Sequence, residues 1–206
     1  MEALQTNIED VLKDEKIIDV WGRKNPRFEK KYQRVGDKKK IIEIITDYGI
    51  GASENTNAKG KVLGAGYEAY IMAYFIGLYS NKRLPLSENT DDLKVLGQPI
   101  EKWGNLDSKK NRHAYPGLRS YIFMSLVAKT EIDWIALDKG DIGVHNVANK
   151  LIQTMEEYAN YGFAYMQEKV DDDPGYFFSN RSFLDIFLQL TQKEETQTEN
   201  EELEEL

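Results

Sequence analysis

The apolar residues of this chain recur mostly at helical spacing, and little of the sequence alternates with a period of two. Residues 63–80 are apolar on nearly every face, which is typical of a helix surrounded by other elements. Residues 118–130 and 141–170 instead place their apolar side chains on one stripe, at steps of three and four. The pattern therefore predicts three main helices.

Residues that start or stop helices mark the ends of these segments. Pro116 suits the first position of the second helix, because its missing N–H would be unpaired there. Asp141 can cap the third helix, and the run Asp171–Gly175 stops it. The carboxylates of Asp171–Asp173 could also chelate a divalent cation, but calcium loops need more ligands at alternate spacing. We therefore interpret the triplet as a helix terminator.

Shorter elements are expected around the three main helices. Residues 6–19 begin with a capping-box pair and carry a modest apolar stripe, and Trp21 and Gly22 then interrupt that helix. Residues 38–48 are interpreted as a short helix, although their paired isoleucines would also suit a strand.

Two further segments complete the expected organisation. The stretch 81–115 is rich in Pro, Gly, Asn and Asp, which predicts one long ordered loop. An ordered loop of that length usually has a function. A last helix follows Ser179 or Asn180, either of which can cap it.

The length and composition of the chain favour one globular domain. With 206 residues, 41% hydrophobic and 11% aromatic, the chain is long enough for a substantial core. The predicted class is all-α: an irregular or orthogonal bundle of five to six helices, with residues 1–192 as a single helical domain. Residues 193–206 are predicted to form a disordered acidic tail, because they offer too little apolar surface to fold.

Several classes of protein are excluded or disfavoured by composition. The chain has no cysteine, which excludes disulfides, thiolate metal sites and cysteine nucleophiles and fits a reducing compartment. Its N-terminus is charged and periodic, unlike a secretory signal. The longest apolar run, residues 69–79, is about half of what a bilayer-spanning helix needs. We expect a soluble cytoplasmic protein without a membrane partner.

The distribution of charge is the feature that points to a partner. The net charge is −8, but residues 194–206 carry seven carboxylates and no base, so the rest of the chain is left with −1. Within that nearly neutral body, the basic stretch Arg23–Lys40 holds nine Lys or Arg against Glu29 and Asp37, a balance of +7. Such a cluster favours a phosphate backbone, and hence nucleic acid, as partner.

Aromatic residues and further cations add to this hypothesis. Trp21, Phe28 and Tyr32 are interleaved with the basic stretch, and they either stack on exposed bases or pack into the core. Two smaller cationic groups, in the loop before Pro116 and before the apolar helix, could join the basic stretch on one surface. The candidate nucleic-acid-binding residues are Arg23, Lys24, Arg27, Lys30, Lys31, Arg34, Lys38, Lys39, Lys40, Lys59, Lys61, Lys109, Lys110 and Arg112.

Candidate catalytic or metal-binding residues are few. Residues 60–66 are small and open a helix, as a phosphate-binding turn would, but they lack the ending of a phosphate-binding loop. His113 and His145 lie in different segments and form no metal-binding pair, and adjacent Glu156 and Glu157 point in different directions on a helix. No nucleophile lies beside a recognisable base. We therefore expect no metal or cofactor, and an enzyme is the less favoured class.

Three segments of the chain resemble a known family. They are the apolar helix with its Lys/Arg-Leu ending (63–86), LRSYIFMSLVAK (118–129), and a helix carrying Asn-x-Gly (147–166). Their order resembles the helical core of DndE, the small DNA-associated subunit of the bacterial DNA sulfur-modification system. The resemblance covers about half of the chain. It implies a helical protein that oligomerises, binds duplex DNA through surface lysines and works with a cysteine desulfurase and other modification subunits.

Two functional hypotheses follow from the sequence. The first is a non-catalytic, nucleic-acid-associated helical subunit of a bacterial DNA-modification or anti-phage defence complex, which contacts phosphates with little base specificity. The alternative is a protein-interaction adaptor, whose basic stretch docks an acidic protein and whose aromatic C-terminal helices form a permanent interface, within a complex or a homo-oligomer. An enzyme acting on small molecules is a third, less favoured class.

Overall fold

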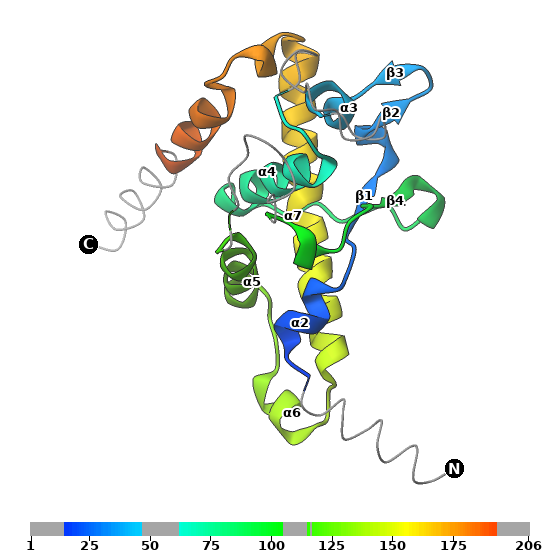
Figure 1. Ribbon diagram of the computed structural model, residues 1–206, viewed down its shortest axis with the longest axis vertical. Coiled ribbons are helices and arrows are strands. Elements are labelled where there is room, and N and C mark those ends of the chain that lie inside the picture. The colour runs from blue at the N-terminus through cyan, green and yellow to red at the C-terminus, as the bar shows by residue number, and fades with distance from the viewer. Residues whose placement is uncertain (1–14, 47–61, 105–114, 116, 193–206) are drawn as a thin grey trace, which may run out of the picture. The chain divides into compact units, whose positions relative to one another are not determined.

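The computed structural model describes residues 15–46, 62–104, 115 and 117–192, and these are mostly helical (Figure 1). The mostly helical class is thus confirmed, while short strands show that the expected all-α description is only approximate. The helices are α2 (Ile17–Gly22), α3 (Ile41–Ile45), α4 (Gly66–Tyr79), α5 (Leu118–Lys129), α6 (Trp134–Lys139), α7 (Val144–Asp172) and a helix over 182–192. The strands are β1 (Arg27–Glu29), β2 (Arg34–Val35), β3 (Lys38–Lys39) and β4 (Leu93–Val95).

The chain divides into two compact units. Unit 1 comprises Met1–Pro26 and Gly97–Met155, and unit 2 comprises Arg27–Leu96 and Glu156–Leu206. Helix α7 is continuous through the boundary, so each unit contains one part of it. The single domain and the bundle expected from the sequence stay predictions.

Unit 1 is built from α2, α5, α6 and the first part of α7. The buried ring of Trp21 packs against Phe123 of α5, with the ring centroids 5.5 Å apart. Thr130, just after α5, donates a hydrogen bond of 3.0 Å from its hydroxyl to that of Thr154 on α7. These contacts hold α2 to the middle of α5 and α7 to the residue that follows it.

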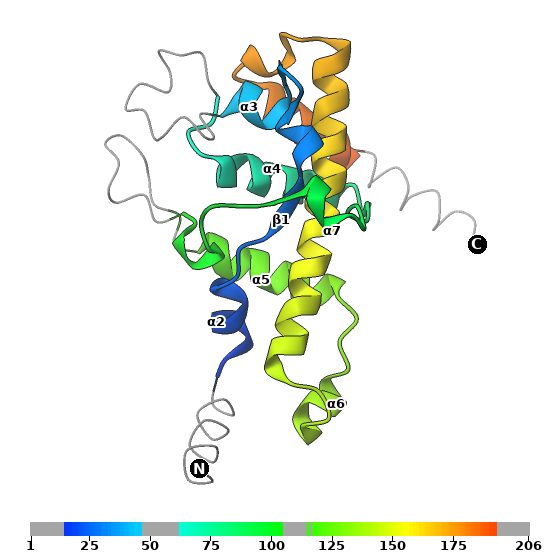
Figure 2. The same cartoon turned by 90° about the vertical axis from the view of Figure 1, so that its right-hand side faces the viewer.

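In unit 2, α4 crosses the second part of α7 at two glycines (Figures 1 and 2). A Cβ atom at Gly77 would lie 2.1 Å from the carbonyl oxygen of Tyr158, and one at Gly162 would lie 1.8 Å from that of Ala73. Real Cβ atoms do not come so close to backbone, so only glycine permits this contact. The two helix backbones therefore touch without intervening side chains.

Aromatic side chains fill the core of unit 2 around Phe163 of α7. Its ring centroid lies 5.7 Å from that of Tyr32, 5.8 Å from that of Tyr70 on α4 and 6.3 Å from that of Phe28 on β1. Aromatic pairs at these separations add stability beyond their buried area. The basic stretch is thus fastened to α7 through its own aromatic residues.

Two antiparallel pairs of short strands were not expected. Strand β1 pairs with β4, so that Phe28 lies opposite Lys94. Strands β2 and β3 form a hairpin in which Arg34 pairs with Lys39. Gly36 has φ +54° at the first central position of its two-residue turn, which is the position that a type II′ turn gives to glycine.

The structure corrects several expected helix boundaries. Helix α2 continues through Trp21 and Gly22, so these residues do not interrupt it. The helix expected over 38–48 is confirmed only for α3, because Lys38 and Lys39 belong to a strand. The stretch 81–115 is not one loop: it contains β4 and the 3₁₀ turns η3 (Thr90–Asp92) and η4 (Ile100–Lys102).

The expected cap of α7 was wrong, because a short helix intervenes. Helix α6 begins at Asp133, whose carboxylate accepts a 2.9 Å hydrogen bond from Ala136 N, and ends at Gly140 with φ +79°. The N–H of Asp141 donates to the carbonyl oxygen of Ala136, so Asp141 completes the end of α6. Helix α7 starts only at Val144 and ends at Asp172, which confirms the acidic triplet as its terminator.

Some expectations lie outside the described residues. They are the start of the first helix, the position of Pro116 as the first residue of the second helix, and the acidic tail 193–206. Across the ranges that the structure does describe, no helix has the length and apolar character needed to cross a membrane.

Candidate nucleic-acid interface

The structure divides the predicted cationic residues into three groups. Arg23 and Lys24 belong to unit 1, and the seven cations from Arg27 to Lys40 belong to unit 2. Five others lie outside the described residues: Lys59, Lys61, Lys109, Lys110 and Arg112. In unit 1, Arg23 forms an ion pair with Glu15. The candidate interface that can be built from the described residues is therefore the group in unit 2.

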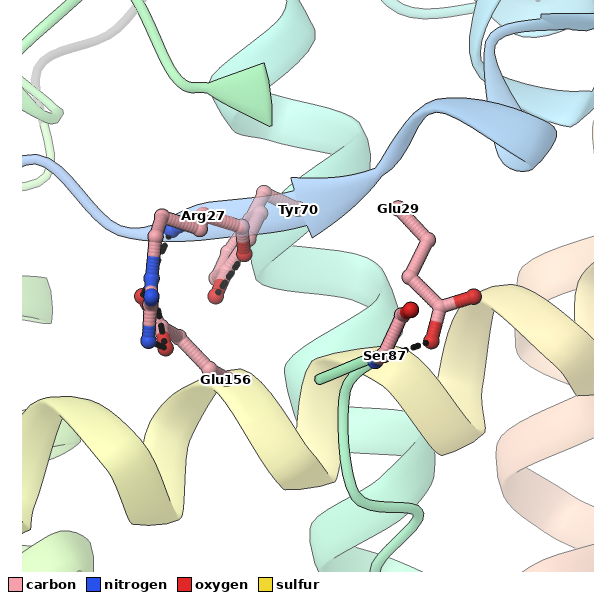
Figure 3. Close-up of polar contacts among 5 residues, drawn as sticks. All are labelled: Arg27, Glu29, Tyr70, Ser87 and Glu156. Carbon is pink, nitrogen blue, oxygen red and sulfur yellow. Dashed lines mark hydrogen bonds and ion pairs between the residues drawn. The ribbon is translucent and has the colours of Figure 1, made fainter. Parts of the chain in front are cut away.

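Arg27 is paired with a buried carboxylate, that of Glu156 (Figure 3). Its Nη2 lies 2.8 Å from Oε2 of Glu156 and its Nε lies 3.1 Å from Oε1, while its backbone N–H donates to Oε1 at 2.8 Å. The Glu156 side chain is only 2% exposed, against 46% for Arg27. The hydrogen bond with Glu156 raises the pKa of Arg27, against the opposing effect of burial. This pair fastens β1 to α7.

Lys31 is likewise paired with a buried carboxylate, that of Glu29. The other oxygen of Glu29 accepts hydrogen bonds from Ser87 N at 3.1 Å (Figure 3) and from Nδ2 of Asn160 at 3.0 Å. The side chain of Glu29 is 7% exposed. Burial would lower the pKa of Lys31, but the hydrogen bond with Glu29 and the attraction of nearby groups raise it overall.

Arg34 is the third cation that is paired with a buried carboxylate, that of Glu43 on α3. Its Nη2 lies 2.6 Å from Oε2 of Glu43, whose side chain is 10% exposed. Gln33 donates to the same carboxylate at 2.9 Å and accepts from Nζ of Lys94, also at 2.9 Å. Burial would raise the pKa of Glu43, but the hydrogen bonds from Arg34 and Gln33 outweigh it and lower the pKa.

We call Arg27, Lys31 and Arg34 the anchored cations, because each is held by a buried carboxylate. A pair in which one partner is buried has a structural role: removing the cation leaves a charge without compensation. The anchored cations still expose about half of their side chains, at 46%, 54% and 45%. Their positive charge is nevertheless largely balanced within the protein.

The β2–β3 hairpin presents its charge differently. All of residues 34–39 are exposed, and they carry Arg34, Lys38 and Lys39 against Asp37, a balance of +2. Among the described residues, no carboxylate lies within ion-pair distance of Lys38 or Lys39, which we call the hairpin lysines. Of the cations of the basic stretch that belong to unit 2, the hairpin lysines are thus those that an external phosphate can reach most directly.

The two remaining cations flank these groups. Nζ of Lys30 donates a 2.6 Å hydrogen bond to the carbonyl oxygen of Asp91, at the surface. Lys40, which follows the hairpin, lies 3.8 Å from Asp171 and exposes 26% of its side chain. Both lysines therefore have a partner within the protein, but neither partner is a buried carboxylate.

The aromatic residues of the basic stretch are not available to stack on bases. Trp21, Phe28 and Tyr32 expose 0%, 2% and 4% of their surface. Of the two alternatives that the sequence left open, the core packing is confirmed and the base-stacking surface is wrong. The reason is that Phe28 and Tyr32 pack against Phe163 of α7, and Trp21 packs against Phe123 of α5.

The small residues before α4 do not offer free N–H groups to a phosphate. The carboxylate of Glu68 turns back and accepts hydrogen bonds from Gly64 N at 2.6 Å and from Ala65 N at 3.2 Å. Because the carboxylate of Glu68 occupies these two N–H groups, they are not available to bind a phosphate.

Histidines and carboxylates form no metal centre in the described part of the chain. His145 lies 3.3 Å from Glu15 at the surface, and His113 is outside the described residues. No group of three or more candidate ligands occurs among the residues that are described. Glu156 and Glu157 face different directions, as expected: the first is buried, and the second is half-exposed.

Sequence reasoning missed two features of this surface. The hairpin was signalled by Gly36–Asp37 between Val35 and Lys38, a pair that favours a two-residue turn. Lys94 had no such signal, because it reaches the basic stretch only through the pairing of β1 with β4. That pairing joins segments more than sixty positions apart.

A row of cations over tyrosines on α7 was also missed. The guanidinium of Arg83 lies 4.8 Å from the ring centroid of Tyr158, Nζ of Lys82 lies 5.8 Å from that of Tyr161, and Nζ of Lys169 lies 5.5 Å from that of Tyr165. Tyr158 is at the same time a core residue, with 1% of its surface exposed.

Comparison of the chain with family models, with curated proteins and with solved structures returned no match.

Proposed function

We propose that this protein is a non-catalytic subunit that binds the phosphate backbone of nucleic acid through its exposed hairpin, residues 34–39. Phosphate contacts made by lysines position a nucleic acid without reading its sequence, so the binding is non-specific. The narrower assignment, to a cytoplasmic bacterial DNA-modification or anti-phage defence complex, is supported by the resemblance to DndE alone.

The observation that carries this proposal is the difference in exposure along the basic stretch. The anchored cations are balanced by buried carboxylates, whereas the hairpin lysines project with none within ion-pair distance among the described residues. A hairpin with a two-residue turn also holds its side chains on a defined frame. The proposal therefore depends on two lysines more than on the total charge of the stretch.

Binding of a short labelled DNA duplex to the full-length protein, followed by fluorescence anisotropy across a salt series, tests the proposal. Each phosphate contact contributes about 0.9 to the slope of log affinity against log salt. Charge reversal by Lys38→Glu with Lys39→Glu should abolish detectable binding at moderate salt, and the milder Lys38→Gln with Lys39→Gln should reduce the slope by roughly 2.

The matched control is Lys129→Glu with Lys139→Glu, which makes the same change in net charge at the ends of α5 and α6. Both lysines are exposed and lie in unit 1. We expect this control to reduce affinity only slightly, through the change in net charge. If the two double variants lose affinity equally, the binding reflects overall charge and the hairpin is not the contact. If the unaltered protein does not bind the duplex at low salt, the proposal is wrong.

A single-stranded RNA and a single-stranded DNA of the same sequence extend the test. Since the buried aromatic residues cannot stack on bases, we expect the duplex to bind at least as well as either single strand. Tighter binding of a single strand would show that bases are contacted and would contradict the backbone-only mode.

A further inference from the structure

The two hairpin lysines lie on opposite faces of the β2–β3 hairpin. Successive side chains of a strand point to opposite faces, and residues that pair directly across two strands share a face. Arg34 pairs with Lys39 and Val35 pairs with Lys38, so each pair occupies a face of its own. Figure 1 shows the hairpin extending away from α3.

The face that carries Arg34 and Lys39 is turned toward α3. Nη2 of Arg34 lies 2.6 Å from Oε2 of Glu43. Burial would raise the pKa of Glu43, but the hydrogen bonds that its carboxylate accepts lower it, and the nearby charge of Lys39 adds to that lowering. The opposite face, Val35 with Lys38, therefore points away from α3, and we call it the outer face.

The outer face combines an apolar side chain with a cation. Val35 is 52% exposed and is the one large apolar residue among 34–39. Lys38 is exposed as well, and no carboxylate of the described residues lies within ion-pair distance of it. An exposed valine alone needs no explanation. Here it lies directly opposite a lysine, so a partner that the lysine holds also meets the valine.

We propose that the outer face lies in the major groove of duplex DNA, with Val35 against the 5-methyl group of a thymine. This inference rests on the proposed function and adds the groove and an apolar contact to it. Paired strands lie about 4.8 Å apart, so a two-stranded ribbon with its side chains fits a groove about 12 Å wide but not one about 6 Å wide. The thymine methyl is the apolar group that the major groove presents at its base edges.

Charge determines which part of the hairpin faces the DNA. Asp37 lies in the turn, is exposed, and carries a carboxylate that phosphates repel. The hairpin therefore meets the groove with its outer face and not with its tip. Lys39, on the other face, contacts a phosphate at the rim of the groove, while Lys38 lies beside the bases.

One methyl contact leaves the binding non-specific. A specific site is bound at least about a thousandfold more tightly than other DNA. Burial of one methyl group changes affinity only about threefold to fourfold. The inference therefore concerns how the hairpin lies on a duplex, and it agrees with contacts that are made mainly to phosphates.

The test uses the full-length protein and an A·T-rich duplex in which only the 5-position of the pyrimidine changes. Thymine carries a methyl group there, uracil carries hydrogen, and glucosyloxymethyluracil carries a sugar that blocks the major groove. By fluorescence anisotropy at constant salt, we expect the uracil duplex to bind about threefold to fourfold more weakly than the thymine duplex. Steric overlap should weaken the glucosylated duplex at least about tenfold. Netropsin, which fills the minor groove, should not displace the protein.

The variant Val35→Thr tests the contact, because it keeps the β-branched shape and replaces one methyl group by a hydroxyl. We expect it to bind the thymine and uracil duplexes equally and to keep the salt dependence of the unaltered protein, since its phosphate contacts are unchanged. The matched control is Val95→Thr on β4, because Val95 is 53% exposed and belongs to the same unit. It should keep the preference for thymine. Both variants should keep the melting temperature, since both valines are exposed.

The outcomes separate this inference from the function on which it rests. If binding depends on Lys38 and Lys39 but is equal for the three duplexes, or if netropsin displaces the protein, the hairpin does not enter the major groove; the inference is then wrong and the proposed function stands. A preference for thymine that survives in Val35→Thr, or that Val95→Thr removes equally, shows that Val35 does not contact the methyl group and also overturns the inference. If the unaltered protein binds none of the duplexes, the proposed function is wrong and the inference falls with it.

Discussion

The two halves of the basic stretch in unit 2 are both positively charged but have opposite arrangements. From Arg27 to Arg34, each anchored cation lies against a carboxylate that is 2%, 7% or 10% exposed. From Val35 to Lys39, the chain forms a hairpin in which every residue is exposed. The first half holds β1 and α3 in place, and the second projects its lysines to solvent.

A count of charges therefore does not say which charges are available to a partner. Glu156, which balances Arg27, is 129 positions away in the sequence. Glu43, which balances Arg34, lies outside the run that looked most basic. A local excess of cations can therefore be a stabilising feature of the fold in one part and a binding surface in the next.

The largest effect is expected where an anchored cation is removed. Arg27→Met leaves the carboxylate of Glu156 buried without a partner, which should destabilise the protein by about 3 kcal/mol. Glu156→Gln leaves a guanidinium that is half exposed and can be hydrated, so its cost should be only about 1–2 kcal/mol. Urea unfolding measures both. If Glu156→Gln costs as much as Arg27→Met, the burial of the carboxylate is not what makes the pair structural.

The contact between α4 and α7, the helix that carries Glu156, is the next most sensitive. Gly162→Ala would place a Cβ atom 1.8 Å from the carbonyl oxygen of Ala73, and separating the helices should cost about 1–3 kcal/mol. Gly143→Ala is the control, because its Cβ would meet nothing within 4 Å. The melting temperatures of the two variants are compared, and equal values would mean that α4 and α7 are not in such close contact.

A moderate effect is expected at acid pH through Glu43. Its pKa is lowered in the folded protein, so its pairing contributes stability above the unfolded value of about 4.3. That contribution is lost as the pH falls through the folded pKa, because the unfolded chain then binds the proton more readily. Denaturant unfolding between about pH 7 and pH 3 should show that the free energy of unfolding falls less for Glu43→Gln than for the unaltered protein. If the free energies of the two proteins fall in parallel, the pKa of Glu43 is not lowered by folding.

The smallest effect is expected at the hairpin. Lys38→Glu with Lys39→Glu should change the free energy of unfolding by less than about 0.5 kcal/mol, because both side chains are exposed. Equilibrium unfolding in urea provides the value. A loss comparable with that of Arg27→Met would remove the contrast between the two halves and make the whole stretch structural.

Much of the helical framework was predicted from the sequence, because it depends on local signals. The apolar periodicity predicted α4, α5 and α7, and the acidic triplet with Pro-Gly predicted where α7 ends. The short elements were mostly missed or misplaced. Strand β1 has only three residues, too few to show a period, and α6, with six residues, is also too short to show one.

The candidate site was predicted less well than the fold. The sequence located the basic stretch, but it treated nine cations as equivalent and offered Trp21, Phe28 and Tyr32 for base stacking. Trp21 packs against Phe123, and Phe28 and Tyr32 pack against Phe163, so their burial depends on residues far along the chain. The hairpin lysines were among the candidates, yet nothing in the charge pattern distinguished them from Arg27 or Lys31.

The mostly helical class and the uneven distribution of charge follow from residue types and short-range spacing, so both can be read from the sequence. The division of the cations into balanced and solvent-presented groups cannot, because it depends on which carboxylates are buried beside them. Glu156, which balances Arg27, is 129 positions away and reaches β1 only in the folded chain.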